Sequence, residues 1–113
     1  MKFTQFIVIA LAIVVFFACK KEDPNSLPSC IDQKLVEFDF GGACPTGAKI
    51  DEFAFRGKTV FVFDPGTCGA DLSSEVVDQN CNTLGYLGGF TGNTIIEGED
   101  FSSAQFVRNH WQN

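Results

Sequence analysis

The sequence has little of what catalytic and nucleic-acid-binding sites usually need. It contains one histidine, His110, and eight Lys and Arg residues against fourteen Asp and Glu residues, for a net charge of −6. Phosphate backbones are bound by clustered basic side chains, and no basic cluster or stripe is present, so we expect no nucleic acid partner. No Ser or Cys is placed to act as a nucleophile with His110. We therefore expect no enzyme activity and assign this histidine to the surface or to the edge of the core.

Close cysteine pairs are also missing. A zinc site made of cysteines normally contains a C-x-x-C pair, and no two of the five cysteines have that spacing. Asp78, Asn80 and Asn82 alternate like the first ligands of a calcium loop, but Thr83 stands where that loop needs glycine. We therefore expect neither a metal nor a cofactor.

The longest apolar run, residues 6–18, has thirteen residues and is too short for a spanning helix, which needs about 20. Lys2 precedes this run, and the small residue Ala18 stands before Cys19, an arrangement typical of a lipoprotein signal peptide. We predict that residues 1–18 are the signal peptide and that Cys19 is the lipidated first residue of the mature protein. The alternative is that Cys19 is an ordinary thiol behind another cleavage site, but the A-x-A pattern of such sites is absent.

Lipidation of Cys19 accounts for the odd number of cysteines. An unpaired thiol in an exported protein needs an explanation, and acylation of Cys19 leaves four cysteines for two disulfides. These four are Cys30, Cys44, Cys68 and Cys81. An anchor with more than one acyl chain, palmitate among them, gives stable membrane attachment.

The segment that follows the predicted cleavage site indicates where the protein is sorted. Residues 19–28 are mostly polar and contain two prolines, which predicts a lipidated tether between the membrane and the folded part. Cys19 is followed by Lys20 and not by the aspartate that retains lipoproteins in the inner membrane of some diderm bacteria. We therefore predict an outer membrane lipoprotein facing the periplasm or the cell surface, with membrane contact through the lipid on Cys19.

Residues 29–113 are predicted to form one small domain that begins with a helix over residues 30–40. Ser29 is expected to cap the first amides, with Asp32 three residues on as its capping-box partner. Glycines at 41 and 42 end the helix. The apolar residues of its inner face follow at helical spacing and are Ile31, Leu35 and Phe38.

The clearest strand signal is a β-hairpin. Residues 50–55 and 59–63 are two apolar runs joined by residues 56–58. Apolar residues lie on both faces of each run, so we expect the hairpin to be buried on both sides. Its four aromatic residues are expected to form core and not a ligand groove. They are Phe53, Phe55, Phe61 and Phe63.

The remaining segments give weaker signals. They are predicted strands at 76–78, 83–87 and 94–97, a helical turn at 101–105 capped by Asp100, and a closing segment containing Phe106, Val107 and Trp111. The closing segment is expected to complete the core, although neither the helical nor the strand period fits it. The fold class is α+β, with a small antiparallel β-sheet, one N-terminal helix packed on it and two disulfides.

Four cysteines allow three pairings, and geometry narrows them. A helix from Cys30 to residue 40 rises about 15 Å, whereas the α-carbons of a disulfide lie within about 7 Å of each other. We therefore favour Cys30 with Cys81 and Cys44 with Cys68. The sequential pairing of Cys30 with Cys44 and of Cys68 with Cys81 stays open, because the chain could run straight back after the helix.

Several short motifs follow one another between residues 30 and 111. They are Cys30-Ile31, Lys58-Thr59-Val60-Phe61-Val62-Phe63, Asp78-Gln79-Asn80-Cys81, Gly88-Gly89-Phe90-Thr91-Gly92, and Phe106-Val107 with Trp111. In these motifs the chain resembles a family of small Bacteroidota lipoproteins that share a domain of unknown function. Phe16 and Phe17, just before Ala18, likewise resemble the looser signals of Bacteroidota-type lipoproteins. The resemblance implies no activity, because none is assigned to the family.

Together these features predict a membrane-anchored exported lipoprotein. Its domain is expected to be a non-enzymatic binding or structural module for an unknown envelope or extracellular partner. The alternative is a protease or hydrolase inhibitor, because a disulfide-held loop at residues 64–70 could present a rigid segment to an active site at low entropic cost.

Overall fold

The computed structural model describes residues 27–113, so the predicted signal peptide and Cys19 lie outside the described residues, as does most of the predicted tether. The elements in chain order are α2 (Ser29–Glu37), η2 (Phe38–Gly42), β1 (Lys49–Phe55), β2 (Lys58–Asp64), β3 (Ser73–Asp78), β4 (Thr83–Gly88), β5 (Ile95–Ile96), β6 (Glu99–Asp100), η3 (Phe101–Ser103) and β7 (Gln105–Gln112). Neither the length nor the hydropathy of any helix within this range is enough to cross a bilayer.

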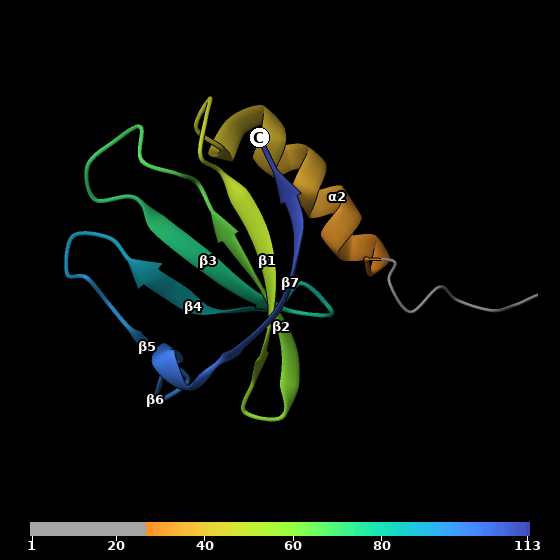
Figure 1. Ribbon diagram of the computed structural model, residues 1–113, viewed down its shortest axis with the longest axis vertical. Coiled ribbons are helices and arrows are strands. Elements are labelled where there is room, and N and C mark those ends of the chain that lie inside the picture. Colours follow the sequence, from red (N-terminus) through yellow and green to blue (C-terminus); the bar gives the residue numbers. More distant parts are fainter. Residues whose placement is uncertain (1–26) are drawn as a thin grey trace, which may run out of the picture.

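The strands form one antiparallel sheet with a small ribbon beside it. The five-stranded sheet has the order β4-β3-β2-β1-β7, so four consecutive strands form a meander and β7 returns to the free edge of β1. β5 and β6 form a separate two-stranded ribbon. Figure 1 shows α2 beside β1 and β7, with β4 at the far side of the sheet. The predicted α+β class, one helix on an antiparallel sheet, is confirmed.

The predicted hairpin is present with a tighter turn than expected. Arg56 and Gly57 alone form the turn, with φ of 53° and 75°. Two successive positive φ values give a turn whose twist matches that of the flanking strands. Lys58 was predicted to belong to the connection, but it already lies in β2 and pairs with Phe55.

The helix begins differently from the prediction. Ser29 is its first residue, and Pro28 occupies the capping position without a side-chain hydrogen bond. The carbonyl of Pro28 instead accepts the amides of Ile31 and Asp32, at 3.0 and 3.1 Å. The predicted capping box of Ser29 with Asp32 is therefore wrong, because Ser29 is already inside the first turn.

The apolar face of the helix agrees with the prediction, whereas its end does not. Ile31 is fully buried, and Leu35 and Phe38 pack against the same cluster. The last turn widens into the π-helical segment η2, and the amide of Ala43 donates to the carbonyl of Phe38 at 2.8 Å. The α-helix therefore ends at Glu37, before the predicted end at residue 40, and the two glycines close the π-helical segment that follows it.

Both faces of the sheet are buried, each in its own core. The core on the helix side consists of Ile31, Ile50, Phe61, Phe63 and Val77. The core on the opposite side consists of Phe55, Val60, Val62, Val76 and Ile96, with η3 contributing Phe101. Of the four hairpin phenylalanines, three are buried and Phe53 packs at the edge of the second core. Their prediction as core is confirmed.

The C-terminal segment, whose type the sequence left open, is the strand β7. Its register against β1 shifts twice, between Ile50 and Asp51 and between Glu52 and Phe53. An extra residue at each bulge breaks the two-residue alternation, which explains why the strand period fitted poorly. Of the three residues of this segment that were predicted as core, only Trp111 packs against the helix-side core. Phe106 and Val107 are 60% and 42% exposed, so their prediction as core residues is wrong.

The predicted strand at 94–97 is short and is not the last strand. Its regular part is only β5, which pairs with β6 across a turn at Glu97 and Gly98. The helical turn predicted at 101–105 ends at Ser103. Asp100 caps this turn as predicted, because its carboxylate accepts the amide of Ser102 at 2.8 Å.

Two disulfides connect the helical segment to the loops of the sheet. Cys30 pairs with Cys81 across 6.1 Å between α-carbons, which ties the start of α2 to the turn between β3 and β4. Cys44 pairs with Cys68 across 5.6 Å, which ties the segment after η2 to the loop after β2. The favoured pairing is confirmed, and the sequential pairing is wrong.

Replacement of each disulfide by two serines is expected to destabilise the domain in the order of the loops that they close. The bonded cysteines are 51 residues apart for Cys30–Cys81 and 24 apart for Cys44–Cys68. In the chain-entropy model, closing loops of these lengths stabilises the folded state by about 4 and about 3.5 kcal/mol, respectively. Urea unfolding followed by Trp111 fluorescence measures both losses. A clearly larger loss for the shorter loop would contradict the entropic explanation.

Candidate functional site

The pairing register places one row of side chains across the helix-side face of the sheet. Glu75 of β3 lies opposite Tyr86 of β4 on one side and opposite Phe63 of β2 on the other. Phe63 lies opposite Ile50, which lies opposite Trp111. Directly opposed residues share a face of the sheet. The row therefore starts with an aromatic ring and a carboxylate and ends in the apolar core.

The helical segment covers only the apolar end of this row. The ring of Phe38 contacts those of Phe63 and Trp111 edge to face, at centroid distances of 5.3 and 5.8 Å. Lys34 of α2 still reaches Glu75, and beyond it Tyr86 lies half exposed at the other end of the row. There the surface is hollowed into what we call the helix-side groove. Its lining is Phe38, Gly42, Phe63, Pro65, Asp71, Leu72, Ser73, Glu75 and Tyr86, with Lys34 and Glu37 at its helix end.

Glu75 is the best-connected polar residue of the helix-side groove. Lys34 lies 2.8 Å from one carboxylate oxygen, and the hydroxyl of Thr83 donates to the other at 2.5 Å. Burial raises the pKa of Glu75, but the hydrogen bonds from Lys34 and Thr83 and the charge of Lys34 lower it by more, so it lies below its ordinary value. Glu75 is therefore ionised at neutral pH.

A second polar cluster lies on β1 and β7. His110 Nε2 is 2.7 Å from a carboxylate oxygen of Glu52, and their side chains are 9% and 17% exposed. The guanidinium Nε of Arg108 lies 3.8 Å from the same oxygen, and the ring of Phe61 lies 5.7 Å from that of His110. The carboxylate of Glu52 is thus the hydrogen-bond partner of the His110 ring. This carboxylate holds the bulged edge strand against β1.

The adjacent carboxylates Asp51 and Glu52 point to opposite faces, as their strand position predicts. Asp51 is buried on the other face, where Asn109 donates to it at 2.8 Å and Lys49 lies 3.4 Å away. Each carboxylate thus has its own partners on β7. They do not form a common acid–base pair.

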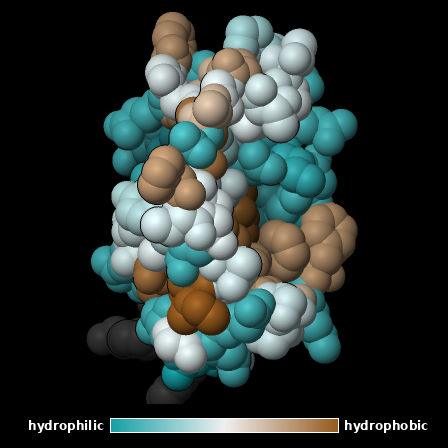
Figure 2. All heavy atoms as spheres, turned by 90° about the vertical axis from the view of Figure 1, so that its left-hand side faces the viewer, coloured by the Kyte–Doolittle hydropathy of each residue, from teal (hydrophilic) through white to brown (hydrophobic). Residues whose placement is uncertain are grey.

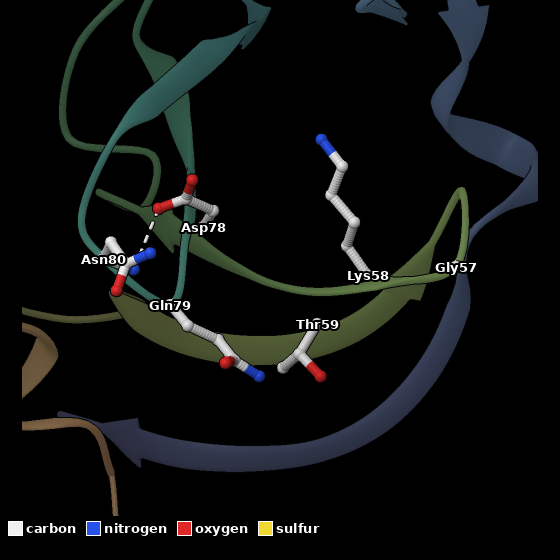
Figure 3. A pocket seen from close by; sticks show the side chains of 6 residues that line it. All are labelled: Gly57, Lys58, Thr59, Asp78, Gln79 and Asn80. Carbon is white, nitrogen blue, oxygen red and sulfur yellow. Dashed lines mark hydrogen bonds between the residues drawn. The ribbon is translucent and has the colours of Figure 1, made fainter.

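The turn between β3 and β4 borders a second hollow, lined by Gly57, Lys58, Thr59, Asp78, Gln79 and Asn80 (Figure 3). The carboxylate of Asp78 accepts the amides of Asn80 and Asn82, each at 2.9 Å, and the side-chain amide of Asn82 at 3.1 Å. Burial raises the pKa of Asp78, but these hydrogen bonds lower it by more. The oxygens that resembled a calcium loop in the sequence therefore serve to close a turn. No group of three or more metal-ligating side chains is found between residues 27 and 113.

The outer surface around β4 and β5 carries scattered apolar side chains. Tyr86 and Ile95 are about half exposed, and Phe90 is 89% exposed. Figure 2 views this side, and its brown apolar atoms lie in separate groups among white and teal atoms. The surface on this side therefore consists of small apolar patches between polar ones.

The sequence predicted the two disulfides, whereas the helix-side groove was not expected. Cys30 lies in the first turn of α2, Cys44 just after η2, Cys68 in the loop after β2 and Cys81 in the β3–β4 turn, whereas Cys19 lies outside the described residues. The groove combines residues from the helical segment, from β2, β3 and β4, and from the loop between β2 and β3, so no contiguous motif marks it. One signal was present: Glu75 lies two residues before Val77, which places a carboxylate on a core-facing side of β3.

The part of the chain after the helical segment matches a known protein family. Residues 43–113 match the model of a family described as "Domain of unknown function (DUF6970)". No curated protein and no solved structure matches the chain. The match begins after the helical segment and covers the whole sheet.

Replacement of Glu75 by glutamine is expected to lower the free energy of unfolding by about 1 kcal/mol at pH 7, since it weakens charged hydrogen bonds at a partly buried site. Because the folded state has the lower pKa, the unfolded chain takes up the proton first as pH falls. The stabilisation that Glu75 gives the folded state is therefore complete at pH values above the ordinary carboxyl pKa. It is lost as the pH falls through the lower pKa of the folded state.

Thermal unfolding of the parent chain and of the Glu75→Gln variant between pH 7 and pH 3 measures this dependence. The matched control is Glu97→Gln, which removes a carboxylate paired with Lys58 at 3.3 Å in a more exposed position. The difference between parent and Glu75→Gln should shrink on acidification. A difference that stays constant to pH 3 would show that the charge of Glu75 is not its source.

Proposed function

The chain belongs to the DUF6970 family, a family of unknown function, and from its own residues we propose that it is an exported lipoprotein anchored at Cys19. In this proposal residues 1–18 are a signal peptide, and residues 19–28 are a lipidated tether. The domain at 29–113 is a non-enzymatic binding or structural module at the outer membrane. Its partner is an envelope or extracellular molecule.

The observation that carries the proposal is the state of the cysteines. Four of the five are consumed in two disulfides within the domain. Structural disulfides persist in oxidising compartments, which supports export. Cys19 is then the one cysteine left over, and it stands directly behind an apolar segment of signal-peptide length. Acylation gives this thiol a role.

The sequence before and after Cys19 supports the location. Phe16 and Phe17 resemble the signals of Bacteroidota lipoproteins, and Lys20 supports sorting to the outer membrane. If fully extended, the predicted tether at residues 19–28 spans at most roughly 35 Å. The tether would therefore keep the domain close to the bilayer while leaving its surfaces accessible to a partner.

The helix-side groove supports a binding role. It is lined by aromatic rings and ionised groups, and its open end exposes Tyr86. Binding sites typically combine apolar walls with a few placed polar groups.

Intact mass spectrometry of the protein, expressed with its signal in a diderm host, tests the anchor. We expect a chain that starts at Cys19 with acyl groups attached, and no mass increase on alkylation without reductant, because the other four thiols are paired. The matched control is Cys19→Ser, which should be neither acylated nor cleaved at this site. A parent chain cleaved elsewhere without acyl groups, or one with free thiols in the domain, would overturn the proposal.

A protease or hydrolase inhibitor is the second candidate, and the loop after β2 favours it. Residues 67–72 are exposed, and the Cys44–Cys68 disulfide holds their start. The amide of Cys44 also donates to the carbonyl of Pro65 at 2.8 Å, and Asp64 accepts the amide of Gly66 at 2.9 Å. A loop fixed in this way loses little entropy when it enters an active site.

Inhibition assays against a panel of secreted serine, cysteine and metalloproteases test the inhibitor function. An inhibitor of this kind should act stoichiometrically, and the double variant Cys44→Ser with Cys68→Ser should inhibit at least tenfold more weakly because its loop is no longer fixed. Absence of inhibition at micromolar protein, with both disulfides confirmed intact, would remove this candidate.

A further inference from the structure

We propose that the helix-side groove binds an arginine or lysine side chain of a partner polypeptide, held by the carboxylates of Glu75 and Asp71 and by the ring of Tyr86. This inference deepens the proposed binding module and rests on it only in treating the groove as a contact surface. The partner is then a protein with an exposed basic segment.

The first argument is that a cation of the chain itself already occupies one end of the groove. The ammonium of Lys34 lies 2.8 Å from Glu75 and 5.6 Å from the centroid of the Phe63 ring. A carboxylate beside an aromatic face is the arrangement that binds organic cations. Lys34 thus shows which chemistry this surface accepts.

The second argument is that the open end of the groove adds another carboxylate, Asp71, and another aromatic ring, Tyr86, to Glu75. Tyr86 lies directly opposite Glu75 in the sheet and is 53% exposed. Asp71 lines the same hollow, and it has no hydrogen-bond or ion-pair partner within residues 27–113. Each oxygen of Glu75 has one partner and can accept a further hydrogen bond. The carboxylates of Asp71 and Glu75 and the half-exposed ring of Tyr86 therefore remain available to a second cation.

The third argument is the charge of the groove. Asp71, Glu75 and Glu37 line it against the single cation Lys34. The whole chain is acidic as well, so the field around the groove attracts basic groups and repels anions. A basic polypeptide segment is complementary to this surface, whereas a phosphate or an acidic peptide is not.

Fluorescence anisotropy on the mature protein in neutral detergent tests the proposal. The probes are three hexapeptides with a neutral fluorophore, in which glycine alternates with arginine, glutamate or serine. We expect binding of the arginine peptide, weakened severalfold in 0.5 M NaCl by screening. The glutamate and serine peptides should not bind. Equal binding of all three peptides, or no binding of the arginine peptide, would overturn the proposal.

Two lysine–glutamate pairs provide matched variants. Lys34–Glu75 lies at the groove, and Lys58–Glu97 lies on the opposite side of the sheet, beside β5. Glu75→Gln should weaken binding roughly fivefold, the scale of one charged contact at a partly exposed site. Glu97→Gln makes the same change in net charge and should alter binding less than twofold.

The lysine variants make the sharper test. Lys34→Met should strengthen binding, because it removes a competing cation from Glu75, whereas Lys58→Met should have little effect. Tyr86→Ala should weaken binding, with exposed Phe90→Ala as its control. Circular dichroism checks that each variant is folded. Equal effects of the groove and control variants would show general charge attraction and overturn the assignment to the groove.

These measurements are independent of the anchor. A chain that proves not to be acylated at Cys19 would still bind the arginine peptide if the groove proposal is correct. Conversely, an acylated chain that binds no basic peptide leaves the lipoprotein proposal standing and removes only the groove ligand.

Discussion

One short helical segment, α2 continued by η2, has to cover a face of a five-stranded sheet. Neighbouring strands lie about 4.8 Å apart, so the sheet is roughly 20 Å wide, whereas a helix with its side chains is about 10 Å across. Phe38 therefore shields Phe63 and Trp111. Ile31 packs in the same core as Val77 of β3, whereas Tyr86 of β4 stays half exposed. At the edge of this cover a polar residue must replace an apolar one, and Glu75 does so with Lys34 and Thr83 as partners. The helix-side groove is a consequence of this mismatch in width.

The same sheet is stabilised differently on its two faces. On the helix side, the core packs against α2 and the Cys30–Cys81 disulfide, whereas on the other side Ile96 and Phe101 of the β5–η3 segment close the core. Asp51 and Glu52 add a polar contact to β7 on each face, since each binds a side chain of that strand on its own face. A chain with so small a core depends on such local supports, because a domain of this size buries only a modest fraction of its surface.

The elements with one strong signal could be predicted from the sequence. The hairpin, the apolar face of the helix, the strand pair around Cys81 and the disulfide pairing are as expected, because each depends on spacing along the chain. The bulges of β7 interrupt the two-residue alternation by which a strand is predicted. The helix starts at Ser29 itself, so Ser29 does not cap it as expected. The groove could not be predicted, because its residues come together only through the register that sets Phe63, Glu75 and Tyr86 side by side.

The position of Cys30 has a mechanical consequence. It is the second residue of α2, so tension on the chain ahead of the helix reaches this cysteine almost at once. The bond to Cys81 then carries the load directly into the turn between β3 and β4, past the hydrogen bonds of the helix. The helix cannot be peeled from the sheet one turn at a time, because the load bypasses it. A force applied ahead of the helix would thus reach β3 and β4 through a covalent bond.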